Sequence, residues 1–261
     1  MSREQIVKLR NSLRRIADSL KFPKNKYCCI CDTSIGSFFP YRRGKRAPLM
    51  VALDIIGSDV NNFGCPRCGC HDRERHLLLY LKAFGLLDTF KGAAILHFAP
   101  EGRLSKIIES KIPGRFVMGD LYPTSKDIET IDMLAIDYPS ESFDFVIANH
   151  VLEHVDDDLM ALSELRRVLK IGGYAILQTP YSNKLTQTFS DPGVDTDSAR
   201  YQAYGQEDHV RLYGGDIFAR IESAGFKSRV ATHEEKLADI DPLKFGVNEK
   251  EPFFLFERAD S

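Results

Sequence analysis

Apolar residues recur every three or four positions within the first 20 residues, a spacing that places them on one face of a helix. The positions are Ile6, Leu9, Leu13, Ile16 and Leu20. Pro23 ends the pattern. The spacing predicts an amphipathic helix over residues 3–20, and its apolar face is suited to pairing with a second copy of the chain. We therefore expect a homodimer to be compatible with this sequence.

Further along the chain the periodicity changes twice. Residues 24–70 are short and turn-rich, and the apolar spacing of DRERHLLLYLKAF predicts a helix over 72–84. From residue 93 short apolar runs alternate with amphipathic ones, which predicts a parallel sheet covered by helices on both faces. Strands are expected at 93–98, 116–119, 131–136, 143–148, 174–178, 227–232 and 253–257, and helices at 102–111, 156–169 and 216–224. Residues 181–212 carry few apolar positions and predict an inserted lid over the substrate.

Composition and charge divide the chain into two parts. Residues 1–82 contain 16 Lys and Arg against 7 Asp and Glu, whereas the remainder contains 19 against 30. This asymmetry predicts an N-terminal module (1–84) and a larger domain (85–261). It also favours an anionic partner for the module, although a solvated basic face explains it equally well. No window approaches the roughly 18 apolar residues of a membrane span, and the N-terminus lacks the apolar stretch of a secretory signal. We therefore expect a cytoplasmic protein without membrane contact.

The six cysteines all lie in the N-terminal module, in two tight clusters. Two Cys-x-x-Cys pairs can place four thiolates around one tetrahedral zinc ion. The predicted ligands are Cys28, Cys31, Cys65 and Cys68. Cys29 and Cys70 are spare, and either could replace a neighbour. Four thiolates complete the coordination of zinc, so the predicted site is structural rather than catalytic. Buried free thiols are the alternative interpretation.

The segment from Ile95 to Gly102 passes from an expected strand into an expected helix, where backbone amides can meet a nucleotide. A dinucleotide-binding protein carries Gly-x-Gly-x-x-Gly here, whereas this chain has Ala99 and Glu101 at glycine positions. The carboxylate of Glu101 would repel a pyrophosphate and attract an ammonium group. The loop therefore favours a cofactor with an ammonium group over NAD or ATP.

Acidic residues follow the next two expected strands. Asp120 can accept hydrogen bonds from both ribose hydroxyls. Asp137 can accept one from an adenine amino group, with the amide of Tyr138 on a ring nitrogen. We also assign Leu121 and Asn149 to the cofactor site. Any one acidic residue here could simply be solvated, but the ordered set indicates a nucleoside cofactor.

These residues lie within a recognisable framework. Residues 142–180 (SFDFVIANHVLEHVDDDLMALSELRRVLKIGGYAILQTP) resemble the fourth strand, following helix and fifth strand of class I, type 11-like, S-adenosylmethionine-dependent methyltransferases. CPRCG at 65–69, LHFAPE at 96–101 and GQEDHVRLYG at 205–214 resemble a subfamily with an N-terminal four-cysteine zinc ribbon. The resemblance implies a Rossmann-like, seven-stranded, mostly parallel sheet and S-adenosylmethionine as cofactor. The first loop departs from the glycine-rich pattern of the class.

Methyl transfer to a hydroxyl group benefits from a general base, and His is the commonest. His209, at the end of the expected lid, is the first candidate, and its acidic neighbour Asp208 could fix its tautomer. Arg211 could hold an anionic group of the substrate. His150 is the second candidate because it follows the fourth expected strand, whose carboxyl end faces the cleft of such sheets. Tyr181 is a third candidate for contact with the substrate.

Three functions are compatible with the sequence. The first is an O-methyltransferase that acts on a small hydroxylated molecule, such as a sugar, a glycan building block or a natural-product intermediate. The second is an RNA methyltransferase whose basic zinc module grips phosphates. The third is a non-catalytic subunit that binds the cofactor and scaffolds a partner. The acidic lid disfavours the second, and the retained Asp120 and Asp137 disfavour the third.

Overall fold

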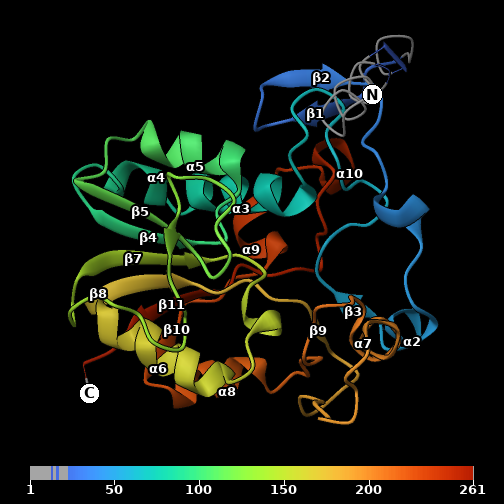
Figure 1. Cartoon of the computed structure of the whole chain (residues 1–261). Coiled ribbons are helices and arrows are strands. Elements are labelled where there is room, and N and C mark those ends of the chain that lie inside the picture. The colour runs from blue at the N-terminus through green and yellow to red at the C-terminus, as the bar shows by residue number, and fades with distance from the viewer. Residues whose placement is uncertain (1–12, 14–15, 18–22, 261) are drawn as a thin grey trace.

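The structure, a computed structural model, describes residues 13, 16–17 and 23–260 (Figure 1). The amphipathic helix expected over residues 3–20 therefore lies largely outside the described residues. Within the described part of the chain, no helix is long and apolar enough to cross a membrane.

Seven strands form the central sheet. They are β4 (Ala94–Phe98), β5 (Arg115–Asp120), β6 (Glu129–Thr130), β7 (Phe143–Ala148), β8 (Leu169–Ile176), β10 (Phe226–Ser228) and β11 (Leu255–Arg258). Their spatial order is β10-β11-β8-β7-β4-β5-β6. β11 is antiparallel to both of its neighbours, and the pairs from β8 to β6 are parallel. The predicted Rossmann-like sheet of seven mostly parallel strands is confirmed.

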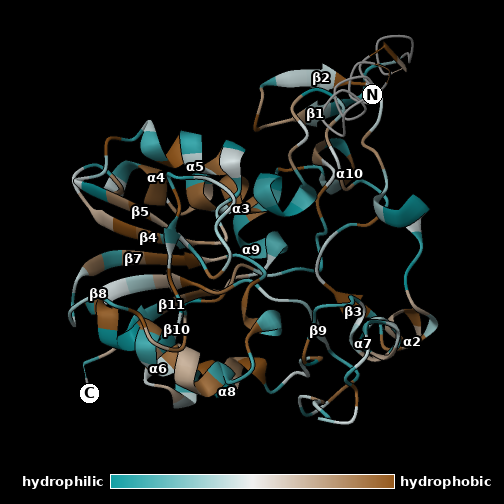
Figure 2. Ribbon diagram, viewed as in Figure 1, coloured by the Kyte–Doolittle hydropathy of each residue, from teal (hydrophilic) through white to brown (hydrophobic). Residues whose placement is uncertain are grey.

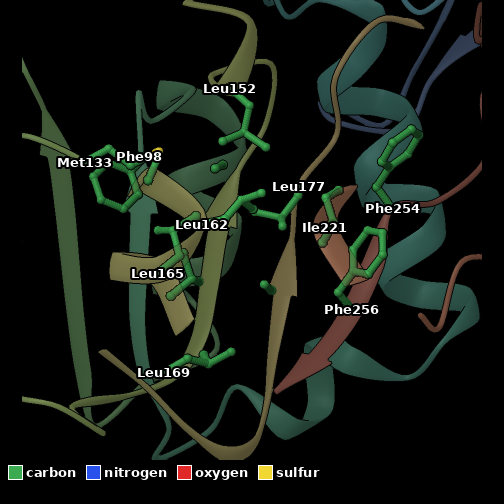
Figure 3. Close-up of a cluster of buried hydrophobic side chains, with 14 of the residues drawn as sticks. Phe98, Met133, Leu152, Leu162, Leu165, Leu169, Leu177, Ile221, Phe254 and Phe256 are labelled. Atoms are coloured by element: carbon green, nitrogen blue, oxygen red, sulfur yellow. The ribbon is translucent and has the colours of Figure 1, made fainter. Parts of the chain in front are cut away.

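Helices cover both faces of this sheet. The helices are α3 (Asp72–Ala83), α4 (Leu86–Thr89), α5 (Gly102–Glu109), α6 (Asp158–Val168), α8 (Ile217–Ser223), α9 (His233–Leu237) and α10 (Pro242–Phe245). Along β7, Phe145 and Ile147 pack with α3, α4 and α5, whereas Val146 and Ala148 pack with α6 and α8. This alternation follows from the pleat of a strand. Figure 2 shows β4 and β7 as hydrophobic strands, and Figure 3 shows Leu162 and Leu165 of α6 within the cluster of apolar side chains that covers one face of the sheet.

Two strand boundaries differ from those expected. The third strand in sequence lies at Glu129–Thr130 rather than at 131–136. Ile131, Met133 and Ile136 are buried, but they lie in turns and irregular backbone after β6, where they pack in the main apolar cluster. The apolar spacing at 131–136 therefore indicates buried side chains, and it does not correspond to a strand. The fifth strand begins at Leu169, earlier than expected, because β8 pairs with β7 from Phe143 onward.

The remaining N-terminal elements divide into two groups. β1 (Lys26–Cys28) and β2 (Thr33–Ile35) form a hairpin that carries the first cysteine pair. A second group comprises η1 (Tyr41–Gly44), α2 (Pro48–Ala52) and β3 (Ile55–Ile56). α3, which the sequence placed in the module, packs in the same apolar cluster as β4 and β7 and so covers the sheet.

The lid docks on the second N-terminal group. It contains β9 (Tyr181–Ser182) and α7 (Asp197–Tyr204). β3 pairs with β9 in antiparallel fashion, with Ile56 opposite Tyr181. Met50 of α2 and Tyr204 of α7 share one buried cluster. Gly205 ends α7 in a left-handed conformation, and a Cβ there would lie 3.0 Å from the Met50 sulfur. Segments far apart in sequence thus form one layer (Figure 1, lower right).

Candidate functional site

Four cysteine sulfurs gather where the β1–β2 hairpin meets the loop before α3. The Sγ atoms of Cys28, Cys31, Cys65 and Cys68 all lie within 4.8 Å of one another. The Cys28–Cys68 and Cys31–Cys65 separations are 3.8 and 3.9 Å. Sulfurs about 2.3 Å from a tetrahedral zinc ion are roughly 3.8 Å apart. The four residues therefore fit the ion predicted from the sequence.

The two spare cysteines lie in different places. Cys70 is buried, and its sulfur is 3.4 Å from that of Cys28, so it is a direct neighbour of the four-cysteine cluster. Cys29 faces away from the cluster and donates to the Arg75 carbonyl at 3.6 Å. Of the two spare cysteines, Cys70 therefore adjoins the cluster, whereas Cys29 makes a hydrogen bond elsewhere.

The loop after β4 holds a buried carboxylate at the expected cofactor cleft. Glu101 is the N-cap of α5, and its oxygens accept from His97 Nε2 at 3.0 Å and from Asn149 Nδ2 at 2.7 Å. Arg73 Nε lies 3.8 Å from the same carboxylate. Burial alone would raise the pKa of Glu101, but His97 and Arg73 hold it below its ordinary value. Ala99 adopts φ 43°, the left-handed conformation that a glycine of this loop would take.

The residues expected at the ribose and the adenine line up along the neighbouring strands. Asp120 ends β5, and one of its oxygens accepts from the Tyr122 amide at 2.8 Å. Leu121 is exposed beside it, and so is Asp137. The amide of Tyr138, expected on an adenine nitrogen, donates instead to the Ile136 carbonyl at 2.8 Å.

A cavity of about 590 Å³ lies between the second N-terminal group, the lid and the end of β7. We call it the central cavity. Its wall is basic and aromatic, and the described residues that line it include no Asp or Glu. The basic residues are Arg42, Lys45, Arg46 and Arg73, with His71, His150 and His209, and the aromatic ones are Phe39, Tyr41, Phe63, Tyr201 and Tyr204. Arg73 and His150 connect the cavity to the cofactor loop, since Arg73 approaches Glu101 and His150 follows Asn149.

His150 is buried between two carboxylates. Its Nδ1 lies 3.3 Å from Glu153 and its Nε2 lies 3.4 Å from Glu251. Burial by itself lowers the pKa of His150, but the two carboxylates outweigh it and raise the pKa to about 9. Its backbone is left-handed, with φ 57°. Both ring nitrogens of His150 are therefore engaged by the protein.

His209 is buried in a different manner. Its Nδ1 lies 3.1 Å from the Tyr204 carbonyl, so this nitrogen carries the proton that is donated. Its Nε2 is buried and has no hydrogen-bond partner among the described residues. Burial lowers the pKa of His209, which favours the neutral ring. One nitrogen lone pair is thus left open on a side chain that lines the central cavity.

Three other expected site residues have structural partners. Asp208 contacts His154 at 3.3 Å and does not orient His209. Arg211 is buried outside the cavity wall and donates to three carbonyls, of Leu152, Val155 and Asp156. Tyr181 is also buried, and its ring packs against Phe218 and Phe254. The side chains of Arg211 and Tyr181 are turned into the protein, whereas that of Asp208 is exposed.

Arg73 and the aromatic wall of the cavity escaped the sequence analysis. Arg73 follows the second cysteine pair closely, in a segment that we assigned wholly to zinc binding. Its position in the first turn of α3, within reach of Glu101, depends on how that helix docks on the sheet. A basic residue in the first turn of a helix is electrostatically unfavourable, and that was the available signal.

One family model and several solved structures are similar to parts of this chain. Residues 106–177 match the family model of a methyltransferase domain. No curated protein matches the sequence. A solved S-adenosylmethionine-dependent methyltransferase from Mesorhizobium loti is 16% identical, with a TM-score of 0.48 over 69% of this chain and 97% of that chain. YcgJ from Bacillus subtilis is 13% identical, with a TM-score of 0.43 over 71% and 100%.

The structure of 1,6-didemethyltoxoflavin-N1-methyltransferase from Burkholderia thailandensis, which contains S-adenosylhomocysteine, is 14% identical, with a TM-score of 0.43 over 70% and 79%. The family match runs from within α5 to just past the end of β8, and so includes β5, β6, β7 and β8. It lies within the larger domain in which the sequence predicts a methyltransferase.

Proposed function

We propose that this S-adenosylmethionine-dependent methyltransferase transfers its methyl group to a hydroxyl oxygen of a small anionic molecule bound in the central cavity. The observation that supports this most strongly is the wall of that cavity, which is basic and aromatic and lacks a carboxylate among the described residues. An anionic molecule gains electrostatic energy there, whereas a cationic one is repelled. A volume of about 590 Å³ suits a small molecule better than a folded RNA.

The chain's own residues can hold each part of the cofactor. Glu101, Ala99 and Asn149 surround the place where a strand runs into a helix, and the carboxylate of Glu101 suits the ammonium group. Arg73 suits the carboxylate at the same end of the cofactor. Asp120 suits the ribose hydroxyls, with Leu121 against the sugar. At the other end, Asp137 and Tyr138 remain our candidates for the adenine. The cofactor supplies an electrophilic methyl group, and the protein supplies its orientation.

His209 is the residue that we propose to act on the acceptor hydroxyl. Its Nε2 carries a lone pair without a hydrogen-bond partner among the described residues, because Nδ1 is committed to the Tyr204 carbonyl, and the side chain lines the cavity. Both ring nitrogens of His150 face carboxylates, and we propose that this residue positions the end of β7 through these two ion-pair contacts. Asp208 and Arg211 then contribute indirectly, by fixing the segment that carries His209.

A first experiment tests the cofactor site without the acceptor. Asp120→Asn should weaken S-adenosylhomocysteine binding by roughly 1–3 kcal/mol, because charge-assisted hydrogen bonds to the ribose are lost. Asp127→Asn is the matched control, an exposed acidic residue of the following loop. Titration calorimetry measures both. Equal affinities for the two variants and the wild type would contradict the assignment of Asp120.

A second experiment tests the acceptor. The protein is incubated with cofactor labelled in its methyl group and with two fractions of cell extract, anionic small molecules and total RNA. We expect label in the first fraction, in a bond that is stable as an ether or ester. His209→Gln should lower the rate by roughly 10²–10⁴ while S-adenosylhomocysteine affinity is retained. Label confined to RNA would support the RNA methyltransferase and overturn our proposal.

A further inference from the structure

A second group of metal-binding side chains lies beside the central cavity, apart from the cysteines. It consists of Glu153 and His154, both in η2 (Leu152–His154), and His209. One potential ligand atom of each lies within 4.8 Å of the other two. Glu153 and His209 are 1% and 3% exposed, and His209 also lines the central cavity.

The two imidazoles are held as metal ligands usually are. His209 Nδ1 donates to the Tyr204 carbonyl at 3.1 Å. His154 Nδ1 lies 3.2 Å from the Asp208 carbonyl and 3.3 Å from the Asp208 carboxylate. A metal-bound histidine typically donates its second ring N–H to such an oxygen, which fixes the tautomer and leaves the other nitrogen free. Here Nε2 is the free nitrogen of both rings.

Two acceptors lie close to each other in this group without a donor between them. His209 Nε2 is a lone pair, because the proton is on Nδ1. Glu153 Oε2 accepts from Thr179 Oγ1 at 2.9 Å, whereas Oε1 makes no hydrogen bond among the described residues and has His150 Nδ1 at 3.3 Å. The protonated His150 ring balances part of the Glu153 charge, whereas no donor among the described residues reaches His209 Nε2. A buried acceptor without a partner is costly, and a cation bound there would relieve that cost. The third residue of the group, His154, has its ring at 89° to that of His209.

The fold itself brings these residues together. The Val210 amide donates to the Glu153 carbonyl at 2.9 Å. The next residue, Arg211, donates from its guanidinium to the carbonyls of Leu152, at the start of η2, and Asp156, after its end. The Tyr213 hydroxyl donates to the Leu152 carbonyl at 3.3 Å. These contacts attach the end of the lid to η2 without using the side chains of the three candidate ligands.

We propose that Glu153, His154 and His209 bind a divalent transition-metal cation, with open coordination positions toward the central cavity. Two imidazoles and one carboxylate suit Mn²⁺, Fe²⁺, Co²⁺ or Zn²⁺ and disfavour Mg²⁺ and Ca²⁺, which prefer oxygen ligands. Ligands about 2.1 Å from an ion are roughly 3.0–3.5 Å apart, so small side-chain rotations close the site.

This site gives the cation a place in the reaction proposed above, and that role rests on the proposed function. His209 lines the cavity, so an ion held by this side chain would lie beside the bound acceptor. An oxygen of the acceptor can occupy an open position, which orients it and lowers the pKa of its hydroxyl, so that the proton passes to water as the methyl group is transferred. In that state the lone pair of His209 binds the cation, and water rather than the imidazole takes the proton.

Manganese binding tests the site without any acceptor. Zinc-loaded protein is titrated with Mn²⁺, and free Mn²⁺ is followed by electron paramagnetic resonance. Thiolates are poor ligands for Mn²⁺, so the cysteine cluster does not interfere. We expect one Mn²⁺ per chain, and at least tenfold weaker binding in Glu153→Gln and in His209→Ala. Glu207→Gln is the matched control, since Glu207 precedes this segment and pairs with Arg42, and it should bind like the wild type.

The outcomes separate this proposal from the function. Absence of Mn²⁺ binding, or equal binding in all four proteins, overturns the metal site and leaves methyl transfer untouched. Binding that depends on Glu153 and His209, together with no methylated small molecule, upholds the site and counts against the acceptor. Thermal unfolding of each variant checks that it is folded. If Glu153→Gln does not fold, His154→Gln provides an independent variant of the site.

Discussion

At the scale of single residues, the cleft is marked by two side-chain-bearing residues in left-handed conformations. Ala99 follows β4 and His150 follows β7, adjacent parallel strands whose carboxyl ends meet at one edge. A left-handed conformation costs roughly 1–2 kcal/mol for a residue other than glycine. The residue before a proline is further restricted, and Pro100 follows Ala99. Strain of this kind persists where the surrounding structure over-determines the backbone.

Ala99 offers a direct measure of that strain. Ala99→Gly should stabilise the protein by about 0.5–1 kcal/mol, because relief of the left-handed strain exceeds the entropic cost of glycine. Ala99→Val should destabilise it by more than 1 kcal/mol, since a β-branched residue is a greater outlier there. Denaturant unfolding of the three proteins gives the comparison. A glycine variant less stable than the wild type would contradict this reading of φ.

Sequence patterns predicted the surroundings of some candidate residues and not those of others. The four cysteines that cluster are those of the two Cys-x-x-Cys pairs, because two residues between ligands fit a tight turn. Asp120 ends its strand as expected. Arg211 was expected to face the substrate, but its guanidinium donates to backbone carbonyls around η2. The direction of this side chain depends on where the lid docks, and no local sequence pattern encodes that. For the same reason the open Nε2 of His209 could not be foreseen.

At the scale of elements, α3 joins the zinc cluster to the sheet. Its first turn is close to Cys70, and its apolar face packs on β4 and β7. Glu74, at the third position of the helix, accepts from the His71 amide at 2.8 Å, while its other oxygen is buried without a partner among the described residues. Burial raises the pKa of Glu74 to about 7, with further contributions from Glu101 and Cys68 that Arg73 opposes.

Glu74 should make stability depend on pH. Its pKa in the folded protein lies above the ordinary 4.5, so the folded state binds more protons between these values. Stability then falls as pH rises from 4.5 through about 7. Glu74→Gln keeps an acceptor for the His71 amide and cannot ionise. Between about pH 5 and about pH 8, wild type should lose roughly 2 kcal/mol relative to this variant. A difference that is constant with pH would refute the assignment.

Elements with regular periodicity were predicted within a few residues, and short ones were not. The helices at 102–109 and 158–168 and the strands at 94–98 and 143–148 follow patterns set by a two-sided sheet. β3 and β9 are two residues long and exist only because they pair with each other across 125 positions, from Ile56 to Tyr181. Such pairing is a tertiary effect, and it leaves no signature within either segment.

At the scale of the whole molecule, one buried arginine connects three regions. Arg75 of α3 is fully buried, and its guanidinium donates to five carbonyls. These are the carbonyls of Asn62, Phe63, Cys70, Phe245 and Gly246. The guanidinium carbon also lies 3.8 Å from the centre of the Phe38 ring. The cysteine loop, the α10 region and the sheet are therefore connected by a single side chain.

Replacement of Arg75 should destabilise all three regions together. Arg75→Lys cannot reach five carbonyls and should cost roughly 3–5 kcal/mol, because buried acceptors are left unpaired. Arg103→Lys, at an exposed position of α5, should change stability by no more than about 0.5 kcal/mol. Chemical denaturation measures both. A loss for Arg75→Lys as small as that of its control would show that the connection is dispensable.

Zinc removal should act through the same connection. We expect about one zinc per chain by elemental analysis, and Cys68→Ser should lose most of it. Cys29→Ser should retain the metal, since its sulfur faces the Arg75 carbonyl. Cys70→Ser should also retain it if the two Cys-x-x-Cys pairs are the ligands. Zinc lost from Cys70→Ser and kept by Cys68→Ser would instead identify Cys70 as the fourth ligand.

The layer formed by β3 with β9 and by α2 with α7 has a consequence for how this enzyme can change over generations. Most residues that line the central cavity come from 39–73 and 201–209. Those that we propose to hold the cofactor come instead mainly from loops of the sheet. Substitutions in the first set can alter the choice of acceptor while the methyl donor site is inherited unchanged. The two segments must diverge in concert, however, because Met50 and Gly205 touch where they meet. A lineage that acquired a new acceptor would therefore carry paired substitutions where α2 contacts the end of α7.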